Sequence, residues 1–185
     1  VQSIFGKFLP YLYYLDQKWV EQKLNDGLLF PKDENKFAFW EAHFEGYIAF
    51  NNLYNQLYNL LRGDYKKAVD LLGQKKEKEK RREREYNNRL AEHLMISFWR
   101  ELEEIDKPDN LIDIFFEHAS EETRNQAIRY LGSVLESNNP PKEQWKRLRN
   151  LWEKRIKISK DTELAGFVGW LKNVPESIDD LFGLI

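Results

Sequence analysis

Apolar residues recur along most of this chain at intervals of three and four residues, which is the spacing that places them on one face of an α-helix. The pattern is clearest on either side of a proline turn at Pro140-Pro141. Before the turn, Ser120 is a favourable N-cap for a helix whose apolar stripe is formed by Ala127, Leu131, Val134 and Leu135. After the turn, a second helix carries an apolar arc formed by Trp145, Leu148, Leu151, Trp152, Ile156 and Ile158. Two such helices joined by a short turn are the repeating unit of a helical solenoid.

The second helix of this pair has a strongly basic outer face. Its opposite arc is formed by Lys142, Lys146, Arg147, Arg149, Lys154, Lys157 and Lys160. With Arg155 the segment 142–160 holds eight basic residues against Glu143 and Glu153, a net charge of +6. Arg155 itself falls inside the apolar arc. A buried arginine is costly unless it is paired, so we expect it to contact a carboxylate or to extend along its stem to solvent.

Helix ends are predicted where proline, glycine or a capping side chain interrupts the pattern. Pro10 is expected to stop a short first helix, with a second helix over residues 11–24. Gly63 is expected to end a helix that begins near Leu53, and Asp64 to cap the next one. No segment shows the sustained alternation of a β-strand.

The C-terminal part of the chain predicts two more helices. A helix capped by Asp161 or Thr162 contains Gly166 and Gly169. Each glycine costs about 1 kcal/mol relative to alanine in a helix interior, so we expect both to permit a close approach to another helix. A last helix is expected to begin at Pro175.

About nine helices with short links predict an all-α protein, either an irregular helical-repeat solenoid of the HEAT or tetratricopeptide kind or a bundle of antiparallel helices. We expect one all-helical domain over residues 1–185, and the start at Val1 suggests a segment of a longer chain. A sub-boundary is placed at residues 74–85, which include no apolar side chain. Their basic and acidic residues alternate and form i,i+4 pairs, which favours a solvated helix or linker over a nucleic-acid-binding arm.

Composition removes several classes of chemistry. The 185 residues include no cysteine, so thiol nucleophiles, disulfides and cysteine-ligated metals are excluded. The net charge of −2 gives no global attraction to nucleic acid or anionic membranes. No apolar run approaches the ~18 residues of a membrane span. Together these features favour a cytoplasmic protein that does not bind membranes.

No motif for a reaction or a cofactor is present. The three histidines, His43, His93 and His118, stand apart in sequence, and no phosphate loop, dinucleotide fingerprint or nucleophile motif occurs. The carboxylate pairs Glu103-Glu104 and Glu121-Glu122 are interpreted as exposed helical positions. The aromatic series Phe37, Trp40, Phe44 and Tyr47 is interpreted as core. We therefore expect no enzymatic activity, no cofactor and no metal.

Several segments together resemble a known family. They are WEAHFEGYIAFNNLYNQLYNLL (Trp40–Leu61), RLAEHLMISFWREL (Arg89–Leu102), FFEHASEETRNQAIRYLGSVL (Phe115–Leu135), RLRNLWEKRI (Arg147–Ile156) and ELAGFVGWL (Glu163–Leu171). Their order resembles the C-terminal helical region of large bacterial and archaeal defence proteins that carry a signal-transducing NTPase of the STAND class. The resemblance implies a sensor arm that binds a viral protein or holds the enzyme inactive.

The leading interpretation is a non-enzymatic helical-repeat module for protein recognition or scaffolding, with a viral protein or other domains of the parent chain as partner. The alternative is nucleic-acid binding through the basic face of residues 142–160. The candidate interaction residues are Lys142, Lys146, Arg147, Arg149, Lys154 and Lys157.

Overall fold

The computed structural model describes residues 3–72, 81–138, 140–159 and 161–171. These residues form helices joined by turns, and none of them lies in a β-strand, which confirms the predicted all-α class. The elements are α1 (Ser3–Leu15), α2 (Gln17–Asn25), η1 (Glu34–Lys36), α3 (Phe37–Phe50), α4 (Asn55–Leu72), α5 (Arg81–Trp99), α6 (Leu111–His118), α7 (Glu121–Ser137), α8 (Lys142–Ile156), α9 (Asp161–Leu164), η2 (Ala165–Phe167) and α10 (Val168–Leu171).

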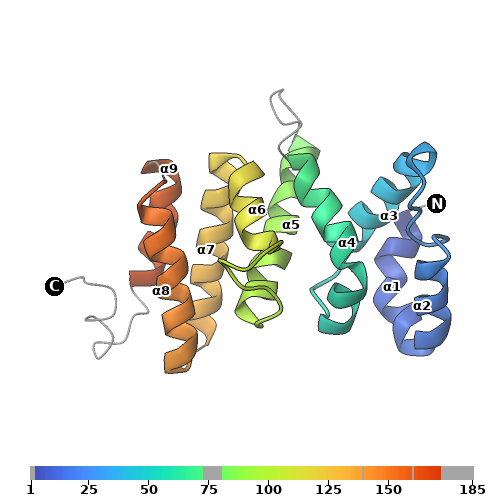
Figure 1. Cartoon of the computed structure of the whole chain (residues 1–185), viewed down its shortest axis with the longest axis horizontal. Coiled ribbons are helices and arrows are strands. Elements are labelled where there is room, and N and C mark those ends of the chain that lie inside the picture. Colours follow the sequence, from blue (N-terminus) through green and yellow to red (C-terminus); the bar gives the residue numbers. More distant parts are fainter. Residues whose placement is uncertain (1–2, 73–80, 139, 160, 172–185) are drawn as a thin grey trace.

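The helices stand side by side along the long axis of the molecule, with α1 and α2 at one end and α8 and α9 at the other (Figure 1). Helix α3 packs against α1 and α5, α5 packs against α7, and α7 packs against the segment from α9 to α10. Helix α4 packs against α6. In Figure 1 α4, α6 and α8 lie in front of α5 and α7. The helices are thus arranged as a two-layer array.

The core of the array is rich in aromatic side chains. Trp40 and Phe44 of α3 stack with ring centroids 5.5 Å apart, and Phe44 meets the edge of Tyr65 at 5.2 Å. Trp40, Phe44 and Tyr47 are buried, so the aromatic series of α3 is core, as predicted. Edge-to-face and offset contacts of this kind each add roughly 0.5–1.5 kcal/mol beyond the burial of area.

The first helix does not end at Pro10, and that prediction is wrong. Helix α1 continues through Pro10 to Leu15, and the break falls at Asp16, whose carboxylate accepts a hydrogen bond of 2.9 Å from the Trp19 amide as the N-cap of α2. Proline removes the hydrogen bond to the carbonyl four residues earlier, here that of Gly6. The side chain of Asn51 donates to this carbonyl at 3.3 Å, so the helix keeps the lost interaction through a tertiary contact.

The predicted break at Gly63 and Asp64 is also wrong, because α4 is continuous across both residues. Leu61 and Tyr65 on either side of Gly63 are buried in the core, and this packing outweighs the low helix propensity of one exposed glycine. The carboxylate of Asp64 does not cap a helix. It accepts a hydrogen bond of 2.7 Å from the indole of Trp40, which joins α4 to α3.

The C-terminal predictions are partly confirmed. Ser120 caps α7, as predicted. Ile156 and Ile158 are exposed, so their placement in the apolar arc is wrong: α8 ends at Ile156 and the chain turns away.

A Cβ at Gly166 would lie 3.0 Å from the Asn125 carbonyl oxygen, which confirms a close approach to α7, whereas a Cβ at Gly169 would meet nothing within 4 Å. The predicted last helix after Pro175 and residues 74–80 lie outside the described residues, while residues 81–85 begin α5.

Candidate interaction surfaces

Helix α1 has apolar side chains on two opposite faces. The inner face packs against α3 and includes the fully buried Leu9. The outer face presents a row spaced by four, three and four residues, whose members are exposed by 47% to 61%: Ile4, Phe8, Tyr11 and Leu15. This row is called the α1 stripe. Helices of folded proteins are usually polar opposite the core face, so α1 differs from an ordinary surface helix.

The α1 stripe continues onto neighbouring aromatic residues. Tyr14 on α1, Phe50 at the end of α3 and Tyr54 before α4 are all exposed. A groove of about 580 Å³ lies beside the stripe and is lined by Lys7, Phe8, Pro10, Tyr11, Tyr14, Asn51 and Tyr54. The ammonium of Lys7 lies 4.7 Å from the centre of the Phe50 ring. The single charge of α1 is therefore placed over an aromatic face, where a cation–π interaction favours it.

The inner face of α1 is held close to α3 by Gly6. A Cβ at Gly6 would overlap the carbonyl oxygen of His43 and would lie 2.7 Å from the Tyr47 amide nitrogen. His43 is buried and contacts the Leu29 carbonyl through Nδ1. This close backbone approach fixes the orientation of α1, and with it the direction in which the α1 stripe faces.

The α1 stripe was missed by sequence reasoning, which divided residues 1–24 into two helices at Pro10. The sequence does hold a signal for it. Lys7 is the sole charged residue of the thirteen in α1. A helix that is apolar on all sides has two faces to bury. The rest of the array buries only the inner face of α1.

The predicted basic face of α8 is largely neutralised by acidic groups. Lys154 bonds the carboxylates of Asp106 at 2.6 Å and Asp113 at 2.8 Å. Burial lowers the pKa of Lys154, but these hydrogen bonds outweigh it and hold the pKa above its usual value. Arg147 points inward and donates to the carbonyls of Phe98 at 2.8 Å and Glu103 at 3.1 Å.

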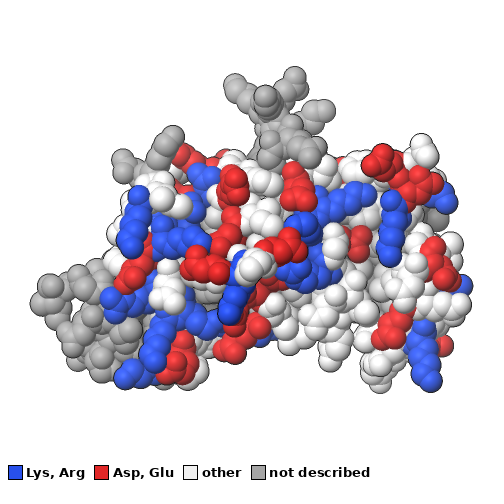
Figure 2. Space-filling view, in the orientation of Figure 1, with Lys and Arg blue, Asp and Glu red and all other residues white. Residues whose placement is uncertain are grey.

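The other predicted residues of that face divide into two groups. Lys146 and Arg149 pair with acidic residues of α8 itself, Glu143 and Glu153. Lys142 and Lys157 are exposed and form no ion pair with the residues that the structure describes. Figure 2 shows lysine and arginine interleaved with aspartate and glutamate on the face over α4, α6 and α8, rather than one continuous basic patch.

Of the two expectations for Arg155, a carboxylate partner or a path to solvent, the structure shows the first, and the partner is Glu163. Arg155 is buried, and its Nε donates to Glu163 Oε1 at 2.6 Å. Arg124 of α7 donates to Glu163 Oε2 at 2.6 Å, and the Ser159 hydroxyl donates to Oε1 at 2.7 Å. Burial raises the pKa of Glu163, but the bonds from Arg155 and Ser159 outweigh it and hold the pKa below its usual value. This cluster ties α7 and α8 together.

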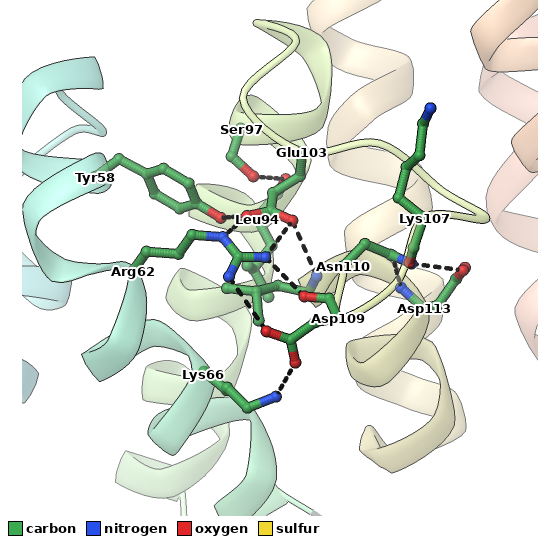
Figure 3. A network of polar contacts seen from close by, with 11 residues as sticks. Tyr58, Arg62, Lys66, Leu94, Ser97, Glu103, Lys107, Asp109, Asn110 and Asp113 are labelled. Carbon is green, nitrogen blue, oxygen red and sulfur yellow. Dashed lines mark hydrogen bonds and ion pairs between the residues drawn. The ribbon is translucent and has the colours of Figure 1, made fainter.

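A second buried carboxylate, Glu103, was predicted to be exposed, and that interpretation is wrong. Helix α5 ends at Trp99, and the following loop takes left-handed backbone conformations at Glu101, Asp106 and Asp109. This path turns the Glu103 side chain inward, between α4 and the start of α6 (Figure 3).

Glu103 accepts hydrogen bonds from α4 and from the first residue of α6. It accepts from the Tyr58 hydroxyl at 2.8 Å, from Arg62 Nε at 2.7 Å and from the Leu111 amide at 3.0 Å. Arg62 also donates to the Asp109 carbonyl at 2.7 Å. These residues form the Glu103 cluster. The contacts drawn as dashed lines in Figure 3 satisfy both oxygens of the Glu103 carboxylate. The cluster joins α4, the α5–α6 loop and α6.

The histidines belong to the packing of the array. His93 is buried, with Nδ1 at 2.7 Å from the Tyr65 hydroxyl and Nε2 at 2.9 Å from the Asn51 carbonyl. Nε2 must donate to this carbonyl, and because burial keeps the ring neutral, Nδ1 accepts from the Tyr65 hydroxyl. Burial lowers the pKa of His93 to about 4. Within the described ranges no three histidine or acidic side chains are grouped as metal ligands.

Comparisons with protein families, with curated proteins and with solved structures find no match to this chain. Among the helices that the structure describes, none combines the length and the apolar character needed to cross a bilayer.

Proposed function

We propose that this chain is a non-enzymatic helical-repeat module that recognises or scaffolds other proteins. The observation that carries the proposal is the α1 stripe, together with exposed Tyr14, Phe50 and Tyr54 and the groove beside them. Contiguous apolar patches larger than a few hundred Å² are uncommon on monomers and mark interaction sites. Tyrosine is among the residue types that dominate the energy of binding at protein interfaces.

The positions of the buried carboxylates and of the basic side chains of α8 support the same function, because most of them already have partners within the chain. The buried carboxylates Glu103 and Glu163 are bonded by arginine side chains of their own chain. Four of the six basic residues expected on α8 are paired or bonded to carbonyls. A long array also offers an extended surface that needs little rearrangement on binding. Apolar contact at α1 is therefore favoured over electrostatic contact at α8.

The resemblance to STAND-class defence proteins indicates the kind of larger protein to which this module would belong. We infer that it acts in the cytoplasm as the C-terminal sensor arm of a multidomain antiviral NTPase. Its partner would then be a viral protein or another domain of the parent chain.

The test is a pull-down with the full-length parent and with this chain, from infected and uninfected cells, with nuclease treatment. Captured proteins are identified by mass spectrometry and purified for a direct binding assay. Tyr11→Glu combined with Phe50→Glu places charge on the exposed apolar surface, and Lys142→Glu combined with Lys157→Glu is the matched control on exposed residues of α8. We expect a purified partner to bind wild type and the α8 variant but not the α1 variant.

The opposite result would be recovery of nucleic acid that is lost at high salt and lost in the α8 variant, while the α1 variant binds normally. That result would move the binding site to Lys142 and Lys157 and replace protein recognition by nucleic-acid binding, whose salt dependence follows from counterion release.

A further inference from the structure

The spacing of the α1 stripe is that of a helix–helix seam. Ile4, Phe8, Tyr11 and Leu15 follow one another at steps of four, three and four residues, the spacing of the a and d positions of a heptad repeat. A surface of this form fits another α-helix of similar length. At 1.5 Å per residue, the thirteen residues of α1 span about 20 Å, so the partner helix needs about three to four turns.

We propose that two copies of this chain associate through their α1 stripes, with the two α1 helices antiparallel about a two-fold axis. The proposal rests on the proposed function, because it names the partner of the same surface. A two-fold interface brings one patch against itself, so it must be free of like charges that would face each other. The α1 stripe meets this condition, since Lys7 is the helix's sole charged residue and lies on the edge of the stripe.

The antiparallel arrangement also gives Lys7 a favourable neighbour. When Ile4 of one copy lies opposite Leu15 of the other, the edge that carries Lys7 and Tyr14 meets the same edge of the second copy. Along the helix axis Lys7 is then about 3 Å from Tyr14 of the other copy and about 7–8 Å from the other Lys7, from the rise of 1.5 Å per residue. A lysine beside a tyrosine ring adds a cation–π contact.

The available area matches a stable dimer. The stripe with Tyr14, Phe50 and Tyr54 has seven exposed apolar side chains, five of them aromatic. A fully exposed aromatic side chain presents about 150–250 Å², so their exposed parts approach the ~800 Å² that one partner contributes to a standard interface. The surface is also preformed, because Gly6 and Asn51 fix α1 on α3. Pairing would continue the row of α1, α3, α5 and α7 across the two-fold axis.

The first measurement is the mass in solution by sedimentation equilibrium over a range of concentrations. Wild type should give twice the chain mass of 22.3 kDa. Phe8→Glu combined with Tyr11→Glu should give the mass of one chain with an unchanged melting temperature, and Ile158→Glu, at a residue 65% exposed near the far end, should remain a dimer. If the double variant unfolds, Tyr11→Ser replaces it and should raise the dimer Kd about tenfold or more.

The second measurement tests the relative orientation of the two α1 helices. Because the chain has no cysteine, the introduced thiols are the only ones present. Ile4→Cys and Leu15→Cys chains are oxidised alone and as a mixture. An antiparallel pair brings position 4 of one copy to position 15 of the other, so disulfide-linked dimers should form in the mixture only. In each variant alone the two thiols are about 16 Å apart along the axis, beyond the Cα separation of a disulfide.

Two results would overturn the proposal. Wild type that stays at the mass of one chain at every concentration excludes self-association, and equal crosslinking of each variant alone excludes the antiparallel pair. Neither result touches the proposed function. That function fails if a purified protein partner is bound equally by wild type and by Tyr11→Glu combined with Phe50→Glu, or if nucleic acid is recovered and is lost in the Lys142→Glu and Lys157→Glu variant. A monomer that binds such a partner through the α1 stripe would identify a helix of another protein as the occupant.

Discussion

The Glu103 cluster and the α1 stripe are opposite departures from the usual distribution of residues. Glu103 is a charged residue that is 4% exposed, and Tyr14 beside the α1 stripe is a large aromatic residue that is 82% exposed. Either observation calls for an explanation, because glutamate is rarely buried without a partner and large apolar patches are rarely left in water. The chain itself explains Glu103, through Tyr58, Arg62 and the Leu111 amide. The residues that the structure describes hold no such explanation for the α1 stripe, which is why we propose a partner molecule for it.

The largest effect is expected from Glu103→Ala, which would disrupt the Glu103 cluster. Removing this carboxylate leaves Arg62 and the Leu111 amide without their acceptor. Arg62 is partly exposed and keeps Asp109 as a partner, but the Tyr58 hydroxyl and the Leu111 amide are buried. A buried donor left without an acceptor costs about 1–3 kcal/mol, so we expect the free energy of unfolding in urea to fall by about 2–6 kcal/mol. Glu104→Ala is the matched control. Glu104 is exposed, so the control should change stability by about 0.5 kcal/mol or less. Equal losses in both variants would contradict the structural role of Glu103.

His93 provides a second buried polar centre, and its effect depends on pH. Burial lowers its pKa to about 4 from 6.5, so the folded state keeps the ring neutral while the unfolded chain binds a proton below pH 6.5. The stabilising contribution is complete above pH 6.5 and is lost as the pH falls towards 4. The shift corresponds to about 3 kcal/mol at 1.36 kcal/mol per pKa unit.

His93→Gln isolates this contribution, because an amide can donate to the Asn51 carbonyl and accept from Tyr65 without titrating. The stability of wild type relative to the variant, measured by urea unfolding at each pH, should fall by about 3 kcal/mol between pH 7 and pH 4. Parallel stability curves for the two proteins would mean that the ring takes up a proton equally in the folded and unfolded states.

Gly6→Ala tests the other region of the comparison, the α1 stripe, by changing the contact that holds α1 against α3. The new Cβ would overlap the His43 carbonyl oxygen, so α1 must move away from α3. Overpacking of this kind costs about 1–3 kcal/mol, and the displaced α1 should also weaken binding at the stripe. Gly63→Ala is the control, since nothing lies within 4 Å of its new Cβ. It should stabilise the protein by up to about 1 kcal/mol through helix propensity. A Gly6→Ala chain with wild-type melting temperature and binding would show that α1 is not held by this contact.

The two regions also differ in what sequence reasoning could find. The all-α class and the core stripes of α3 and α7 follow from spacing alone, and the pairing of Arg155 follows from the cost of burying a charge. Glu103 could not be placed in this way, because its burial depends on left-handed residues in the loop after Trp99. Pro10 was misjudged because the group that replaces the lost hydrogen bond comes from Asn51, far along the chain. The α1 stripe was visible as a helix without charged positions, but periodicity alone does not say which face is covered.

The smallest effect is expected at two exposed lysines of α8: Lys146, which pairs with Glu143 of the same helix, and Lys157, which forms no ion pair with the described residues. Lys146→Glu combined with Lys157→Glu loses the Lys146–Glu143 pair, whose nitrogen and oxygen are 2.9 Å apart on an exposed surface. Exposed pairs contribute about 0–1 kcal/mol, so helical circular dichroism and the melting temperature should stay close to those of wild type. Lys154→Glu is the contrasting variant, because it would face Asp106 and Asp113 with a like charge and should destabilise the protein clearly more. A large loss of helical signal in the double variant would mean that Lys146 and Lys157 support the fold, and that α8 resembles the Glu103 cluster rather than an exposed surface.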